Sequence, residues 1–67
     1  MKQVVVKVRK GDQFVQSLIG LRDWCRRHTR RGFRSYLLHH YKKDFRFVVF
    51  EFDCDKEAMK FEMYTGT

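Results

Sequence analysis

Hydrophobic and polar positions alternate along the first ten residues of this chain. Three valines, Val4, Val6 and Val8, fall on one face of an extended segment at 3–9, and a mixed set of side chains falls on the other. A period of two is typical of a β-strand that is buried on one face only. The segment is therefore predicted to be the first strand.

A helical period begins after the turn at residues 10–12. Apolar side chains then recur every three or four residues, which predicts a helix over about residues 12–30 with one buried stripe. The stripe consists of Phe14, Leu18, Leu21 and Cys25. We expect Asp12 to cap this helix or to lie in its first turn, Gly32 to end it in a left-handed conformation, and Gly20 to let it approach the sheet closely.

Two further extended segments follow. Residues 33–41 alternate without a clearly polar face. We interpret them as a strand, and the alternative is a short helix capped by Ser35. Residues 45–53 are apolar on both faces, as expected for the central strand of a sheet.

The last segment is predicted to be a second helix over about residues 55–64, capped by Asp53 or Asp55 and ending before Gly66. Its apolar residues are Ala58, Met59, Phe61 and Met63. Residues 61–65 also alternate, so they would form a short fourth strand if the helix ended early.

The order β-α-β-β-α predicts an α+β fold in one domain over residues 1–67. A right-handed crossover, with the third strand inserted between the first two, gives an antiparallel sheet in the order 1-3-2 with both helices on one face. This arrangement is a small two-layer sandwich of ferredoxin-like type without its last strand.

The chain is basic, and its charge is unevenly distributed. Its 67 residues carry a net charge of +7. Residues 1–50 contain 13 basic and 3 acidic residues, a balance of +10, whereas residues 51–67 contain 2 and 5, a balance of −3. A field of this sign favours polyanionic partners such as nucleic acid, an anionic membrane or an acidic protein surface.

The two cysteines bear on the cellular compartment. Cys25 and Cys54 are too few and too far apart for a disulfide framework, which favours a reducing environment. No apolar run is long enough for a signal peptide or a membrane span. We therefore predict a cytoplasmic protein without a membrane partner.

The most informative stretch is KDFRFVVF at residues 43–50. It resembles the ribonucleoprotein motif of RNA-recognition-motif domains, which runs basic, glycine, aromatic, small, aromatic, aliphatic, any residue, aromatic. Asp44 and Arg46 depart from that motif. The similarity continues into the second helix and covers residues 43–58. It implies that Phe45 and Phe47 face outward and stack on bases, while Val48, Phe50 and Phe52 face the helices.

Arginines cluster around the end of the first helix: Arg22, Arg26, Arg27, Arg30, Arg31 and Arg34. Positions 22, 26 and 30 are four apart, so we expect one ridge beside the apolar stripe. Guanidinium groups bind phosphates, but cations also stabilise a helix C-terminus, so a binding ridge and a solvated, partly salt-bridged face are both open. Carboxylates at 51, 53 and 55 are expected to neutralise part of the cluster.

The residue types needed for metal binding or catalysis lack the required spacing. His28, His39 and His40 offer suitable atoms, as do the two cysteines, but adjacent histidines on a strand point to opposite faces. We find no nucleophile motif, phosphate-binding glycine loop or apolar carboxylate pair. We therefore predict no metal, no cofactor and no enzymatic activity.

Together these observations favour a small nucleic-acid-binding module that prefers RNA or single-stranded DNA. The arginines and Lys43 would bind phosphates, while Phe45 and Phe47 would stack on bases. The alternative is a protein-interaction module: a homodimer through an open sheet face with Val5 and Val49, or a regulatory, phage-type accessory protein that docks on a larger partner.

Overall fold

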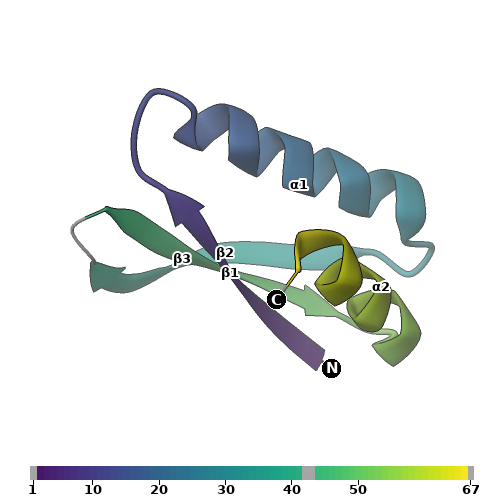
Figure 1. Cartoon of the computed structure of the whole chain (residues 1–67). Coiled ribbons are helices and arrows are strands. Elements are labelled where there is room, and N and C mark those ends of the chain that lie inside the picture. The colour runs from purple at the N-terminus through teal and green to yellow at the C-terminus, as the bar shows by residue number, and fades with distance from the viewer. Residues whose placement is uncertain (1, 42–43, 67) are drawn as a thin grey trace.

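The computed structural model describes residues 2–41 and 44–66, and it contains every element expected from the hydrophobic pattern (Figure 1). In chain order these are β1 (Lys2–Arg9), α1 (Phe14–His28), β2 (Phe33–Tyr41), β3 (Phe45–Phe52) and α2 (Asp55–Thr65). Residues 33–41 form a strand rather than a short helix, and residues 61–65 belong to α2 rather than to a fourth strand. Both preferred interpretations are confirmed.

The three strands form one antiparallel sheet in the order β1-β3-β2, as predicted. Val48 in the central strand pairs with Val6 of β1 on one side and with Leu37 of β2 on the other. A register shift lies between Leu37 and Tyr41 of β2. The topology is that of the expected α+β sandwich: a ferredoxin-like arrangement whose described residues contain no fourth strand.

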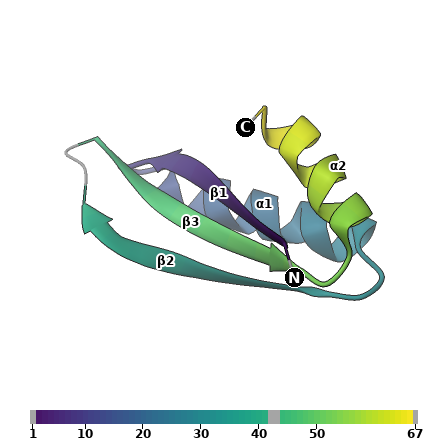
Figure 2. The ribbon, with the colours of Figure 1, turned by 90° about the horizontal axis from the view of Figure 1, so that it is seen from below.

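Both helices cover the same face of the sheet. That face presents Val4, Val6 and Val8 from β1 and Val48, Phe50 and Phe52 from β3, all between 0 and 6% exposed. α1 adds Cys25 to this core, and α2 adds Ala58 and Phe61. Seen from below, the strands lie in front of α1, so the face turned toward the viewer in Figure 2 is the one that α1 leaves uncovered. We call it the open face.

An aromatic stack joins the two helices beside the core. The Trp24 ring of α1 lies between His28, at 4.5 Å, and Tyr64 of α2, at 4.7 Å between ring centroids. Phe61 of α2 contacts the same indole at 5.6 Å. A second link is polar, since the backbone N–H of Arg30 donates to Glu57 Oε2 at 2.7 Å. These contacts fix α2 beside the C-terminal end of α1 (Figure 1).

The predicted caps of α1 are wrong. Gln13 occupies the N-cap position without a side-chain hydrogen bond, and the first turn contains no acidic residue, so Asp12 neither caps the helix nor lies in its first turn. At the other end α1 stops at His28, and Thr29 takes an extended conformation in which its hydroxyl donates to the Cys25 carbonyl at 2.6 Å. Gly32 does have a positive φ of 87°, but it lies in the loop beyond the helix end.

The second helix also begins differently from the prediction. Cys54 is its N-cap residue, and neither Asp53 nor Asp55 caps it. Asp55 instead lies in the first turn with Glu57, where a carboxylate interacts favourably with the positive end of the helix dipole. The helix ends as expected, because Gly66 adopts the left-handed conformation at φ 74°.

Gly20 does not mark a close approach to the sheet. Apart from the backbone of its own helix and its chain neighbours, no heavy atom lies within 4 Å of the position that a Cβ would take there, so the space beside this residue is open. The helices also leave apolar side chains exposed: Val15 and Ile19 on α1, and Met59 and Met63 on α2. Within the described residues, neither helix is long and apolar enough to cross a membrane.

Candidate nucleic-acid interface

Two aromatic side chains of the central strand lie on the open face. Phe45 and Phe47 are two residues apart on β3, and their pairing partners Arg9 and Lys7 belong to the face of β1 opposite the buried valines. The two rings meet edge to face, with 5.8 Å between centroids and 81° between planes. Both remain partly exposed, so a flat ligand can reach them.

Basic side chains from β1 border this aromatic pair. Lys7 Nζ lies 4.5 Å from the centroid of the Phe45 ring, in cation-π geometry. Arg9 is the cross-strand neighbour of Phe45, and both cations are exposed. A recess at this end of the sheet is lined by Lys7, Arg9, Asp44 and Phe45. It therefore places an aromatic ring beside two positive charges and one negative charge.

The middle of the open face is apolar. Val49 pairs with Val5 on one side and Tyr36 on the other. The open face was expected to expose Val49, but this residue is only 3% exposed. Its two cross-strand neighbours flank it and are themselves more exposed, Val5 at 45% and Tyr36 at 43%. The exposed apolar surface in this region thus belongs to the outer strands.

The far end of the open face carries mixed charge. Gln3 Nε2 donates to Glu51 Oε2 at 2.7 Å and to the Tyr36 hydroxyl at 3.2 Å. Arg34 is the cross-strand partner of Glu51. A second recess here joins Arg31 and Arg34 with Glu51 and Asp53. The carboxylates at 51 and 53 therefore lie beside Arg31 of the loop and Arg34 of β2, which weakens the attraction of this end for an anion.

The arginine ridge expected on α1 is shorter than predicted. Arg22 and Arg26 lie on the helix, where they line a small recess with Ile19 and Asp23. Arg27 pairs with Asp23 at 3.2 Å, one turn earlier. Arg30 follows the helix end, so it does not continue the ridge. Of the six clustered arginines, Arg27 alone places its guanidinium group within 4 Å of a carboxylate of the described residues.

The structure brings together only part of the predicted site. Phe45, Phe47 and Arg34 share the open face. The helix arginines, Arg22, Arg26 and Arg27, belong to the layer on the opposite side of the sheet, and Arg30 and Arg31 lie in the loop between α1 and β2. Lys43 lies outside the described residues.

Sequence reasoning missed three side chains that border the aromatic pair or continue its face: Lys7, Arg9 and Tyr36. A signal for two of them was present, because the alternation at 3–9 places Lys7 and Arg9 opposite the buried valines. Combined with a β1-β3 pairing, that alternation brings both cations beside the aromatics of β3. The pairing partner of Tyr36 depends on the register of β2, which the pattern does not specify.

The described residues hold no group of three histidine, cysteine or acidic side chains close enough to bind a metal ion together. The side chains of His39 and His40 lie outside the described part of the structure. Cys25 is fully buried, and this burial raises the pKa of its thiol to about 12. The thiol is therefore protonated at neutral pH, when it behaves as a small apolar core group.

A scan of protein-family models and searches of curated proteins and of solved structures yield no match to this chain. The geometry of the open face is consequently the basis on which a function can be argued.

Proposed function

We propose that this chain is a small nucleic-acid-binding module that holds a single strand, RNA or DNA, on the open face of its sheet. The observation that carries the proposal is the group of Phe45, Phe47 and Lys7: two partly exposed rings 5.8 Å apart, with an ammonium group 4.5 Å from one of them. The resemblance of residues 43–58 to RNA-recognition-motif domains supports the same use of the two rings.

This arrangement suits a single strand for a physical reason. Every unpaired base offers a π-face to an aromatic ring, and each stacked base contributes about 1–3 kcal/mol to binding. In a duplex the faces of the bases are stacked on one another, so the rings have little to contact. The net charge of +7 attracts any polyanion, but the aromatic pair discriminates in favour of unpaired bases.

The phosphate contacts of this proposal come first from β1. A strand that stacks on Phe45 and Phe47 passes beside Lys7 and Arg9, which are the cross-strand neighbours of those two rings. Arg22 and Arg26 lie in the helix layer beyond the other face. We assign these helix arginines, which the sequence favoured as phosphate ligands, to the general positive field that draws the strand to the protein.

A second candidate function rests on the apolar middle of the open face. Val5 and Tyr36 expose nearly half of their surface on either side of Val49. Two copies could cover this strip by packing face to face, as in a symmetric dimer. The charge argues for the first candidate, because a dimer of this kind would bring the Lys7 and Arg9 side chains of both copies onto one interface.

Matched charge reversals test the proposal. Lys7→Glu/Arg9→Glu changes the open face, and Arg22→Glu/Arg26→Glu changes the helix layer. Each double variant replaces two positive charges by two negative ones and takes the net charge from +7 to +3. The general electrostatic loss is therefore nearly the same in both variants. Fluorescence anisotropy with labelled, mixed-sequence RNA, single-stranded DNA and duplex DNA measures the affinity of each variant, and the difference in affinity between the two variants reports direct contacts.

The open-face variant is expected to lose more affinity for single strands than the helix variant. It also loses direct contacts, so its log-log salt slope should fall by about 0.7 for each phosphate contact removed. A larger loss of affinity in the helix variant would place the phosphate contacts on α1 and contradict the proposed position of the strand on the open face. Tight dimerisation without binding to any oligonucleotide would favour the second candidate.

A further inference from the structure

The outer edge of β1 is regular and open. β1 pairs with β3 through eight consecutive residue pairs, and within residues 2–41 and 44–66 no strand lies on its other side. The other outer strand, β2, is interrupted by the shift between Leu37 and Tyr41. A regular edge accepts a further strand more readily than a bulged one, so β1 is the edge at which the sheet can grow.

The backbone groups that face this edge follow from the pairing with β3. Lys10 N–H donates to the Asp44 carbonyl at 2.9 Å, and hydrogen-bonded pairs in an antiparallel ladder recur at every second residue. The even-numbered residues of β1 are therefore bonded to β3. The odd-numbered residues direct N–H and C=O outward, and they are Gln3, Val5, Lys7 and Arg9.

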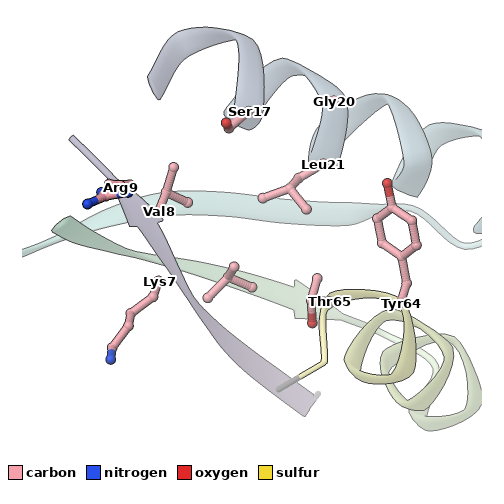
Figure 3. A pocket seen from close by; sticks show the side chains of 9 residues that line it. Lys7, Val8, Arg9, Ser17, Gly20, Leu21, Tyr64 and Thr65 are labelled. Atoms are coloured by element: carbon pink, nitrogen blue, oxygen red, sulfur yellow. The ribbon is translucent and has the colours of Figure 1, made fainter. Parts of the chain in front are cut away.

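A groove of about 530 Å³ adjoins the same edge on its helix side (Figure 3). Val6 and Val8 of β1, Leu21 of α1 and Tyr64 of α2 line it. Figure 3 shows Leu21 pointing from α1 toward the strands, whereas Lys7 points away from α1. A strand added to β1 would thus direct alternate side chains into this groove, toward Val6, Val8 and Leu21, and the others toward the cations of the open face.

The charge of β1 indicates which kind of segment would pair with its free edge. β1 carries no carboxylate; Lys2 pairs with Glu62 of α2 at 3.5 Å, and Lys7 and Arg9 are exposed. A second copy pairing through its own β1 would bring like charges together across the new edge, and this is unfavourable between neighbouring strands. A segment with acidic residues would instead place carboxylates beside these cations.

We propose that the free edge of β1 and its adjoining groove bind an extended peptide segment of alternating apolar and acidic residues, as an added antiparallel strand. The acidic residues lie opposite Lys7 and Arg9 and exchange backbone hydrogen bonds with them. The apolar residues enter the groove beside Val6, Val8 and Leu21. Main-chain bonds supply affinity in such a complex, and the alternate side chains supply specificity.

N-methylated peptides test the strand pairing directly. The probe is a fluorescently labelled peptide of alternating valine and glutamate with blocked ends, and anisotropy measures its binding. In an antiparallel strand the glutamate N–H groups point at β1 and the valine N–H groups point away. Methylation of the glutamate nitrogens should weaken binding by about tenfold or more, whereas methylation of the valine nitrogens should have little effect.

A peptide with the same composition, but with its valines and glutamates in separate blocks, is the control for charge alone. It should bind much more weakly than the alternating peptide. Equal binding of the block and alternating peptides would show that only charge is recognised, and equal binding of the two methylated peptides would exclude a hydrogen-bonded strand. Either result would overturn the proposal.

Substitutions at Gly20 test the groove, because Gly20 lines it and a side chain added there enters open space. Gly20→Phe fills the groove and should weaken peptide binding by about tenfold or more, while the matched Gly20→Ala should retain it. Ser17→Phe, at an exposed groove position, provides a second filling variant if Gly20→Phe fails to fold. A folded, groove-filled protein that binds the alternating peptide normally would contradict the proposal.

The peptide edge shares Lys7 and Arg9 with the proposed oligonucleotide surface, but Phe45 and Phe47 do not line the groove, so substitutions in the groove separate the two proposals. The groove lies on the helix side of β1, and both groove-filling variants should keep the wild-type affinity for single-stranded oligonucleotides. Sedimentation velocity tests the other possible occupant of the edge, a second copy of the chain. A dimer that the alternating peptide does not dissociate would assign the edge to a second copy and overturn the peptide proposal.

Discussion

The two faces of the sheet are built from the same three strands but differ in what covers them. On the helix side, Phe50 and Phe52 of β3 are fully buried beneath Phe61. On the open side, Phe45 and Phe47 of the same strand remain partly exposed and contact each other and Lys7. One strand thus supplies aromatic side chains to both the core and the candidate binding surface.

This difference separates stability from binding within a single element. Full burial of a phenylalanine contributes about 1.5–3 kcal/mol of hydrophobic stabilisation, and a partly exposed one contributes less. The helix-covered face therefore accounts for most of the folding energy of the sheet. The open-face aromatics can be substituted with a smaller loss of stability, which makes the two roles experimentally separable.

The largest expected effect is on the covered face. Phe50→Ala removes a fully buried ring that packs against Phe61 at 4.7 Å and Phe33 at 6.2 Å, so it should lower the free energy of unfolding by about 3–5 kcal/mol. Phe45→Ala, on the open face of the same strand, should cost about 1 kcal/mol. Urea unfolding followed by circular dichroism measures both, and equal losses would contradict the distinction between the faces.

Hydrogen bonds to carboxylates should follow the same division. Glu57 is partly buried and accepts the Arg30 N–H on the helix side, so Glu57→Ala should cost about 1.5–3 kcal/mol. Glu51 accepts from the exposed Gln3 side chain on the open face. Glu51→Ala should cost about 0.5 kcal/mol, and urea unfolding of the two variants provides the comparison. The reverse order would show that the open face carries the stronger polar contact.

The buried thiol predicts a pH dependence of stability. Cys25 has a folded-state pKa of about 12 against an ordinary value of 9.0, so the unfolded chain loses this proton first as the pH rises. The free energy of unfolding is therefore unaffected by this thiol below pH 9. It falls between about pH 9 and 12, by at most about 1.4 kcal/mol per pH unit. Urea unfolding at pH 8, 9 and 10 should show this loss.

Two cysteine variants isolate the effect. Cys25→Ala should reduce the fall in stability above pH 9, whereas Cys54→Ala, which changes a partly exposed loop thiol, should leave it unchanged. An unchanged pH dependence in Cys25→Ala would mean that this thiol is not protected from ionisation in the folded state.

The smallest expected effect concerns the outer surface of α1. The Arg27–Asp23 ion pair is widely exposed, with 74% and 52% of the two side chains accessible. Asp23→Ala should therefore change the free energy of unfolding by only about 0.3–0.5 kcal/mol, within a helix that the core holds in place. A loss of several kcal/mol in a urea titration would show that the arginine surface is structural.

Most of the fold could be predicted because each strand carries its own pattern. The valines at 4, 6 and 8 alternate, and Phe50 and Phe52 face the same way as Val48. Those periods, with the right-handed crossover, are enough to order the sheet. Helix ends are less predictable because local hydrogen bonds compete there, as at Thr29, whose hydroxyl donates to the Cys25 carbonyl. At the start of α1 Gln13 is the N-cap residue without a side-chain hydrogen bond, so the preference of Asp12 for a cap position did not locate the boundary.

The candidate site was harder to predict than the fold. Phe45 and Phe47 lie on the expected face because a strand alternates, but the cations beside them depend on the register between β1 and β3. Arg22 and Arg26 belong to a separate layer, so their closeness to the aromatics in the expected site was an assumption about packing rather than a pattern in the chain. Neighbours within a strand are local information, whereas neighbours across strands require the tertiary structure.

The most direct test of the central claim is Phe47→Ala, measured by oligonucleotide titration and by urea unfolding. Tyr64→Ala is the matched control, because it removes an aromatic ring that is 54% exposed on the helix side. We expect Phe47→Ala to weaken single-strand binding by about 1–3 kcal/mol and to lower the free energy of unfolding by about 1 kcal/mol. Tyr64→Ala should bind single strands more tightly than Phe47→Ala does. Wild-type affinity in a folded Phe47→Ala protein would contradict the proposal that bases stack on the open face.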